Sequence, residues 1–200
     1  MNEYSFLIMR ETDLKKLYQV KSFALKAIVD KGYHGATISY IAKQSGVSDG
    51  YLYRHYSNKN ELVIELFKET MGYFHTLIFN LIESENKISE ILKKSFQFLA
   101  DTSSETPEKT AFIFIMDHDH NFAFPEVIKD NFVKIGQKLW AKGIQTGEIS
   151  NKRSIEDVLT ITFGMPVKML EMRRKGIISN KPLSLHDIEN IVEMCLNALI

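Results

Sequence analysis

Apolar residues recur at three- and four-residue spacing along most of this 200-residue chain, the period of an α-helix with one buried face. Glycine and proline are sparse, and β-branched residues are not clustered into alternating runs. The pattern predicts an all-α fold of about nine helices. Ser, Thr and Asp mark several of the predicted helix starts, because their side chains accept backbone N–H groups left unpaired at a helix N-terminus.

The first third of the chain is predicted to contain four helices. Each range is given from the residue that caps the helix: Thr12 or Asp13 to Gly32, Thr37 to Gln44, Ser48 to about Tyr56, and Ser57 or Asn58 to Ser84. Gly32 suits a helix end, because glycine adopts the left-handed conformation that often terminates a helix.

The rest of the chain is predicted to form five more helices. They cover Ile88 to Leu99, Ala111 to Met116, Pro125 to about Thr146, Ser154 to about Arg174, and Ser184 to Ile200. A polar break is expected from Thr102 to Pro107, and Gly147 is expected to end the helix that Pro125 opens. Gly164 and Pro166 lie inside an apolar helix and predict a kink there.

Residues 37–53 have the spacing of a helix-turn-helix. Ala42 supplies a small side chain where two short helices approach, and Gly46 tolerates positive φ at the turn. The positions expected to face the preceding helix are Ile38, Ile41, Val47 and Leu52. The outer face of the second short helix is then free to enter a major groove of DNA. The alternative is a helical hairpin that only packs.

Composition and charge narrow the functional class. The formal net charge is zero, but residues 1–60 carry nine Lys or Arg against five Asp or Glu, so affinity for phosphate is expected in the first third. The single cysteine, Cys195, excludes an intrachain disulfide. No signal peptide or membrane-spanning stretch is evident, and we expect a soluble, cytoplasmic protein.

The helix-turn-helix segment also resembles the DNA-binding domain of TetR-type transcriptional repressors, densely over residues 15–65. The residues that carry the resemblance are Gly32-Tyr33, Thr37-Ile38, Ile41-Ala42, Gly46-Val47-Ser48, Gly50, Leu52 to Tyr56, and Lys59 to Leu62. The resemblance implies a homodimer that binds a palindromic operator and releases it when a small molecule enters the C-terminal domain. No cofactor, metal site or enzymatic activity is expected.

Carried over residue by residue, the resemblance implies a set of DNA contacts. These residues are Thr37, Ser48, Asp49, Gly50, Tyr51, Tyr53, His55 and Lys59. Thr37 and Lys59 would lie at helix N-termini, where backbone N–H groups favour a phosphate. Asp49 and Tyr51 depart from the family's usual residues: an acidic side chain would favour a cytosine amino group, and Tyr51 could pack on a thymine methyl. Tyr53 and Tyr56 could instead be core aromatics.

The resemblance divides the chain into a DNA-binding domain, residues 1–58, and a ligand-sensing and dimerisation domain, residues 59–200. The expected lining of an apolar ligand pocket is Phe98, Phe114, His118, Trp140, Met165 and Met169. The expected dimer interface is Val158, Ile188, Ile191, Val192, Cys195 and Leu199, because the last two helices carry more apolar surface than one buried stripe requires.

Three alternatives bear on the C-terminal domain. The run Met116 to Asn121 contains potential metal ligands, but His118 and His120 would point about 200° apart on a helix, so a polar helix end is preferred. A hydrogen-bonding role in a pocket is the third reading of this run. A regulator with the same motif but no small-molecule ligand would switch through a partner protein or act constitutively. A helical enzyme is disfavoured because no phosphate loop, nucleophile elbow or His-Glu-x-x-His pattern is present.

Overall fold

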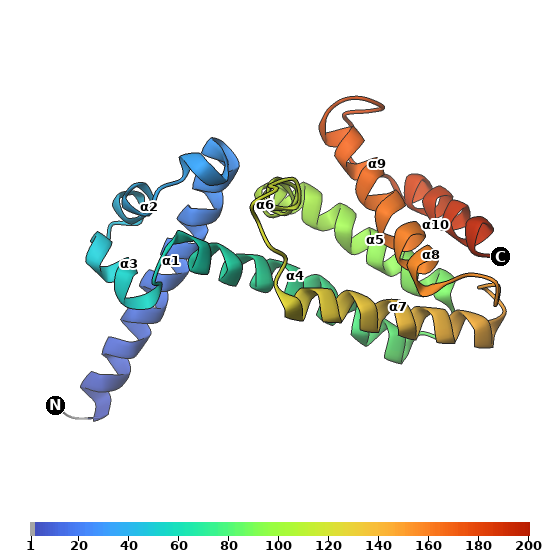
Figure 1. Cartoon of the computed structure of the whole chain (residues 1–200), viewed down its shortest axis with the longest axis horizontal. Helices are drawn as coiled ribbons and strands as arrows, with labels where there is room; N and C mark the ends of the chain where they lie inside the picture. Colours follow the sequence, from blue (N-terminus) through green and yellow to red (C-terminus); the bar gives the residue numbers. More distant parts are fainter. Residues whose placement is uncertain (1–2) are drawn as a thin grey trace. The chain divides into compact units, whose positions relative to one another are not determined.

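The computed structural model describes the backbone of residues 3–200 and the side chains of residues 13–200, and this part of the chain is all α (Figure 1). Counting the continuous segment α8–η1–α9 as one helix, the described residues form nine helices, as the sequence predicts. The elements are α1 (Glu3–Gly35), α2 (Ile38–Gln44), α3 (Asp49–His55), α4 (Lys59–Ser84), α5 (Ile88–Glu105), α6 (Pro107–Asp117), α7 (Glu126–Thr146), α8 (Ile155–Leu159), the π-helical turn η1 (Thr160–Gly164), α9 (Met165–Arg174) and α10 (Leu185–Leu199).

Most helix ends follow from local capping. The side chains of Ser154 and Ser184 each accept a backbone N–H three residues on, and an aspartate at that position bonds back to the serine N–H. Gly147 ends α7 with a φ of +73°, and Gly32 interrupts α1 with a φ of +72°. The predicted starts at Ser154 and Ser184 and the predicted end at Gly147 are confirmed, whereas the predicted end at Gly32 is a kink, after which α1 continues to Gly35.

Two predicted helix limits are wrong. The first helix begins at Glu3, so Asp13 lies inside α1 and does not cap it, while the side chain of Thr12 lies outside the described residues. The polar segment after Leu99 continues α5 to Glu105, and only Thr106 separates it from α6. In both places the polar residues that suggested a boundary are compatible with a helix interior.

The chain packs as two compact units. Unit 1 comprises Met1–Thr70 with Glu108–Ala123, and unit 2 comprises Met71–Pro107 with Phe124–Ile200. Helix α4 contributes residues to both. The boundary after residue 58 between a DNA-binding domain and a sensing domain stays a prediction.

In unit 1, α2 and α3 pack against each other and α2 packs against α1 (Figure 1). Ile41 and Leu52 are fully buried between these helices, as the motif requires. The segment from α6 to Ala123 joins this unit through aromatic contacts: the ring of Phe67 in α4 lies 4.9 Å from the ring of Phe122 and 6.4 Å from that of Phe112.

In unit 2, α5 packs against α7 and α10, and α7 packs closely on α8. The buried core joins the second half of α4 with these helices, and Ile88, Ile135 and Val158 within it are fully buried. Gly136 allows the close approach of α7 and α8, because a Cβ built there would lie 2.8 Å from Leu159 Cγ. None of the helices in the described part of the chain combines the length and apolar character that a membrane crossing requires.

Candidate nucleic-acid interface and apolar cavity

The turn between α2 and α3 is fixed by its own backbone and by two caps. Thr37 Oγ1 accepts the N–H of Tyr40 at 3.2 Å, and Ser48 Oγ accepts the N–H of Tyr51 at 3.1 Å. Between them Gly46 has a φ of +70°, where an L side chain would be strained. The local sequence therefore holds α3 at a defined angle to α2.

One face of α3 is buried against α1. Leu52 is fully buried and Tyr51 is 7% exposed. The Tyr51 hydroxyl donates to Asp13 Oδ1 at 2.8 Å, and burial together with this carboxylate raises the pKa of Tyr51 to about 12. The prediction that Tyr51 packs on a thymine methyl is therefore wrong, because its ring fills the space between α3 and α1.

The opposite face of α3 is exposed. It presents Asp49, Gly50, Tyr53 and Arg54. Tyr53 is 57% exposed and is therefore not a core aromatic, whereas Tyr56 is 4% exposed and belongs to the core. The Asp49 carboxylate accepts a hydrogen bond from the Ser39 hydroxyl of α2. Arg54 was missed in the sequence prediction. Its guanidinium lies 5.3 Å from the Tyr51 ring centroid, and its charge in the last turn of a predicted recognition helix was the available signal.

His55 is half-buried on the flank of α3. Its Nε2 lies 3.7 Å from Asp13 Oδ2, and its ring centroid lies 4.8 Å from that of Tyr51. Asp13 therefore contacts two side chains of α3. Neither contact was predictable from the motif, since Asp13 lies 38 residues from Tyr51 in the sequence.

Lys59 opens α4 and is held against the end of α1. Its Nζ donates to the carbonyl oxygen of Tyr33 at 2.6 Å and lies 4.1 Å from the Tyr33 ring centroid. Burial lowers the pKa of Lys59, and the negative charge of Asp119 acts in the opposite direction. The Asp119 carboxylate also lies 3.5 Å from His34 Nε2. The segment after α6 thus places a negative charge among basic side chains of unit 1.

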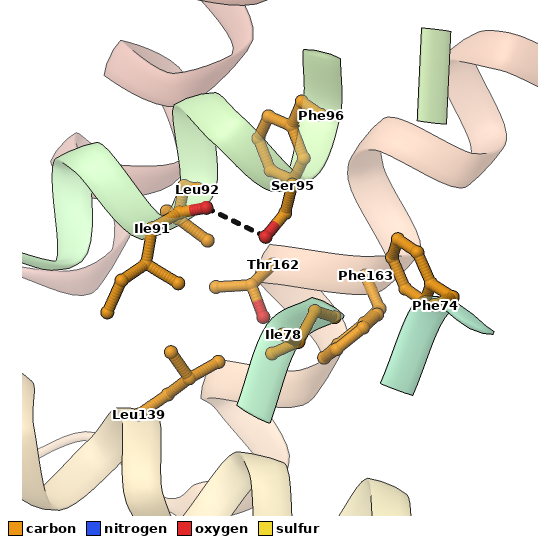
Figure 2. A pocket seen from close by; sticks show the side chains of 9 residues that line it. All are labelled: Phe74, Ile78, Ile91, Leu92, Ser95, Phe96, Leu139, Thr162 and Phe163. Atoms are coloured by element: carbon orange, nitrogen blue, oxygen red, sulfur yellow. Dashed lines mark hydrogen bonds between the residues drawn. The ribbon is translucent and has the colours of Figure 1, made fainter. Parts of the chain in front are cut away.

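Unit 2 contains a small apolar cavity of about 10 Å³ (Figure 2). It is lined by Phe74, Ile78, Ile91, Leu92, Ser95, Phe96, Leu139, Thr162 and Phe163. The two polar lining residues bond within their own helices: Ser95 Oγ donates to the carbonyl of Ile91, and Thr162 Oγ1 to that of Val158, both at 2.7 Å. The space is therefore apolar in character and has room for about one water molecule.

One wall of the cavity comes from the π-helical turn η1, which supplies Thr162 and Phe163 (Figure 2). In an α-helix the ring of Pro166 would clash with the carbonyl of Thr162, four residues earlier. A wider turn avoids this clash. The irregularity predicted from Gly164 and Pro166 is confirmed, as a π turn that ends at Gly164.

The cavity does not coincide with the predicted pocket lining. None of Phe98, Phe114, His118, Trp140, Met165 and Met169 lines it. Phe98 stacks on the lining residue Phe74, with ring centroids 6.3 Å apart. Trp140 Nε1 donates to the Arg153 carbonyl at 2.7 Å, and both methionines pack on the unit 2 core. Phe114 and His118 belong to unit 1, where His118 Nδ1 lies 2.8 Å from the Phe114 carbonyl oxygen.

The predicted dimer residues lie in the core of unit 2. Val158, Ile188, Ile191, Val192, Cys195 and Leu199 are at most 8% exposed. Burial raises the pKa of Cys195 to about 11. The prediction named the wrong face of these helices, because their apolar stripe is used within the chain by α5 and α7. Three large apolar residues of this segment remain exposed: Leu185, Met194 and Ile200, at 65%, 55% and 69%.

No group of three or more potential metal ligands gathers within the residues that the structure describes. The run after Asp117 forms a turn, in which Asp119 Oδ1 accepts the N–H of Asn121 at 2.9 Å.

Comparison with known proteins agrees with the fold and with the motif. Residues 22–66 match the model of the bacterial regulatory proteins of the tetR family. A fatty acid metabolism regulator protein from Bacillus subtilis (strain 168) is 29% identical over 153 residues, which cover 74% of this chain and 78% of that protein.

Two solved structures share the fold over nearly the whole chain. The transcriptional regulator FadR from Bacillus subtilis, in complex with stearoyl-CoA, has a TM-score of 0.78 at 23% identity and covers 92% of this chain and 99% of its own. AibR, in complex with isovaleryl coenzyme A and operator DNA, has a TM-score of 0.69 at 18% identity, and the match covers 90% of this chain and 97% of AibR.

Proposed function

Because this chain is a TetR-type transcriptional regulator, we propose that it is a repressor that binds a palindromic operator as a homodimer and releases it on binding a fatty acyl thioester of coenzyme A. It is a DNA-binding protein and not an enzyme. We further propose that it acts in the cytoplasm, with residues 1–58 as the DNA-binding domain and residues 59–200 as the sensing and dimerisation domain.

The observation that carries DNA binding is the exposed face of α3, the recognition helix, beside the capped start of α2. The proposed contacts are Thr37, Ser48, Asp49, Gly50, Tyr53, His55 and Lys59, to which we add Arg54 and from which we remove Tyr51. Arg54 and Lys59 supply the positive charge for phosphates, and Tyr53 offers a hydroxyl donor. Asp49, bonded to Ser39, orients the start of the helix.

A single recognition helix reads too few base pairs for a specific site, so two copies are needed, with half-sites roughly 34 Å apart. We propose that the dimer forms through the outward side of the last two helices, where Met194 and Ile200 are exposed. Two copies related by a two-fold axis would bury the same patch on each.

The proposed effector is an acyl-CoA. Two solved relatives bind acyl thioesters of coenzyme A, stearoyl-CoA in FadR and isovaleryl coenzyme A in AibR. In this chain the walls of the unit 2 cavity are mainly aliphatic and aromatic, and the hydroxyls of Ser95 and Thr162 are bonded within their own helices, which suits an acyl chain. The volume of about 10 Å³ is far too small for an acyl chain, so the helices around it must separate on binding.

Effector and operator then act by linkage: each selects a different conformation, and each lowers the affinity of the other by the same factor. Helix α4 is the natural coupling element, since Lys59 at its start is a proposed DNA contact and Phe74 and Ile78 in its second half line the cavity.

The test begins with selection of the operator from a random DNA pool by the full-length protein. Fluorescence anisotropy then measures affinity for the selected DNA with stearoyl-CoA, isovaleryl-CoA or free coenzyme A added. We expect acyl-CoA to weaken operator binding at least tenfold and free coenzyme A to leave it unchanged. Unchanged affinity with every acyl-CoA of short, medium and long chain would overturn the proposed effector class.

The small cavity favours a second candidate, a regulator of the same operator that takes no small-molecule ligand. That protein would bind the selected DNA but show no heat release with acyl-CoA in calorimetry. The two candidates therefore give opposite results in the same titration.

A further inference from the structure

His75, in the second half of α4, is a polar side chain in an apolar place. Its side chain is 1% exposed. Nδ1 lies 3.3 Å from Asn131 Nδ2 of α7, while Nε2 is buried and has no hydrogen-bond partner among the described residues. Buried polar atoms are nearly always paired, so an unpaired ring nitrogen calls for an explanation.

The hydrogen of the His75 ring can be placed from its one partner. An amide nitrogen only donates, so Nδ1 of His75 accepts from Asn131 and the ring proton is on Nε2. Burial lowers the pKa of His75 to about 4, which keeps the ring neutral near pH 7. The unpaired group is therefore an N–H donor without a charge.

A run of aromatic rings connects this donor with the cavity. The His75 ring lies 4.8 Å from the Phe132 ring in an edge contact, and Phe132 lies 5.2 Å from Phe163. Phe163 is 6.0 Å from Phe74, and both line the cavity. An apolar chain that leaves the cavity between Phe163 and Phe132 would thus pass along aromatic rings to reach Nε2 of His75.

We propose that Nε2–H of His75 donates a hydrogen bond to the thioester carbonyl oxygen of the bound acyl-CoA. The inference rests on the proposed effector class. A water molecule is a poorer partner here, because an ordered buried water needs two to four polar contacts and Phe132, the ring packed on His75, offers none. The thioester carbonyl is the acceptor that directly adjoins the methylenes of the acyl chain, so His75 fixes how deeply the chain enters.

The test compares stearoyl-CoA with its thioether analogue, S-octadecyl-CoA, which lacks only the carbonyl oxygen. Calorimetry with the full-length wild-type protein is expected to give about tenfold tighter binding of the thioester, the gain of one hydrogen bond to a buried donor. In His75→Phe, which keeps a ring of similar size, the two ligands are expected to bind equally. His75→Gln, which retains a donor, is expected to restore part of the preference.

The outcomes separate the two proposals. Equal binding of thioester and thioether by the wild-type protein, or an undiminished preference in His75→Phe, would overturn the hydrogen bond and leave the effector class standing. If the wild-type protein binds neither ligand, both proposals fail.

A second measurement does not depend on the variant binding ligand. In ¹⁵N-histidine-labelled wild-type protein, the resonance absent from His75→Phe identifies His75. We expect a neutral ring with the proton on Nε2, and a downfield shift of that proton when stearoyl-CoA is added. A ring protonated on Nδ1, or an Nε2 proton whose chemical shift does not change when stearoyl-CoA is added, would contradict the proposal.

Discussion

The phenol of Tyr51 in the recognition helix donates to the carboxylate of Asp13, 38 residues earlier in α1, at 2.8 Å. The same carboxylate lies 3.7 Å from Nε2 of His55. Asp13 thereby contacts the recognition helix at two points one turn apart, on the side opposite to the exposed face. The orientation of the exposed face of α3, the proposed DNA-reading surface, therefore depends on a residue of α1.

Tyr51→Phe removes the hydroxyl and keeps the ring. We expect the free energy of unfolding to fall by about 1 kcal/mol, because a part-buried hydrogen bond to a charged acceptor is lost. Operator affinity should also fall, since the recognition helix is held less firmly. Urea denaturation and anisotropy measure the two effects. Tyr53→Phe, on the exposed face, is the control for stability and should leave it unchanged.

Lys59→Ala tests the proposed phosphate contact at the start of α4. Loss of one neutralised phosphate should weaken binding to all DNA sequences alike and reduce the slope of log affinity against log salt by about 1. Lys68→Ala, an exposed lysine farther along the same helix, is the matched control. Equal slopes for the wild-type protein and Lys59→Ala would show that Lys59 serves only to hold the end of α1.

Gly136→Ala tests the close packing of α7 on α8. The new methyl carbon would lie 2.8 Å from Leu159 Cγ and 2.9 Å from Ile155 Cγ2, so the two helices must move apart. We expect a loss of about 1–3 kcal/mol in the free energy of unfolding. Gly72→Ala in α4 meets no atom within 4 Å and should gain up to about 1 kcal/mol from helix propensity.

Asp187 predicts a loss of stability in acid. Hydrogen bonds from Ser184, and then from Arg173, lower the pKa of Asp187 from 3.8 to about 2. Above pH 3.8 the Asp187 carboxylate is charged in both the folded and the unfolded chain, and its hydrogen bonds stabilise the fold. As pH falls from 3.8 to about 2 the unfolded chain takes up the proton first, so this stability is lost.

Asp187→Asn should therefore be less stable near pH 7 and lose less stability between about pH 4 and pH 2, as measured by urea denaturation across that range. Glu193→Gln removes an exposed carboxylate of the same helix and should keep the wild-type slope. A slope in Asp187→Asn as steep as that of the wild-type protein would contradict the assignment.

Met194→Asp tests the proposed dimer surface. An added charge on an apolar patch that two copies share is placed twice in the interface, so we expect sedimentation to show a shift from dimer to monomer. Asn180→Asp adds the same charge in the exposed loop between α9 and α10 and should leave the dimer intact. Circular dichroism should show equal helix content in both variants.

The sequence was most informative where structure is local. Thr37, Ser48 and Ser184 cap their helices through bonds to the third residue on, and Gly46 takes the positive φ of the turn. These features depend on residues within a few positions of one another, so a single sequence contains the whole interaction.

The apolar cavity of unit 2 and the face proposed for dimerisation were not predictable in the same way. A helical stripe such as Ile188 to Leu199 says that one side is buried, but not whether the covering helix comes from the same chain or from a second copy. Likewise, Phe74 and Phe163 meet only because α4 and η1 pack together. His75 could not be singled out, because its lack of a partner is a property of the packed core.

The turn Thr160–Gly164 has a consequence for the helix that contains it. A π turn accommodates one residue more than an α turn, which rotates everything after it by about 100° relative to regular spacing. The segment before the turn packs on α7, whereas η1 and α9 contact α10. One continuous helix thus packs against two neighbours, because its buried face rotates at the π turn. Its sequence is therefore apolar on every side, although each half buries only one face.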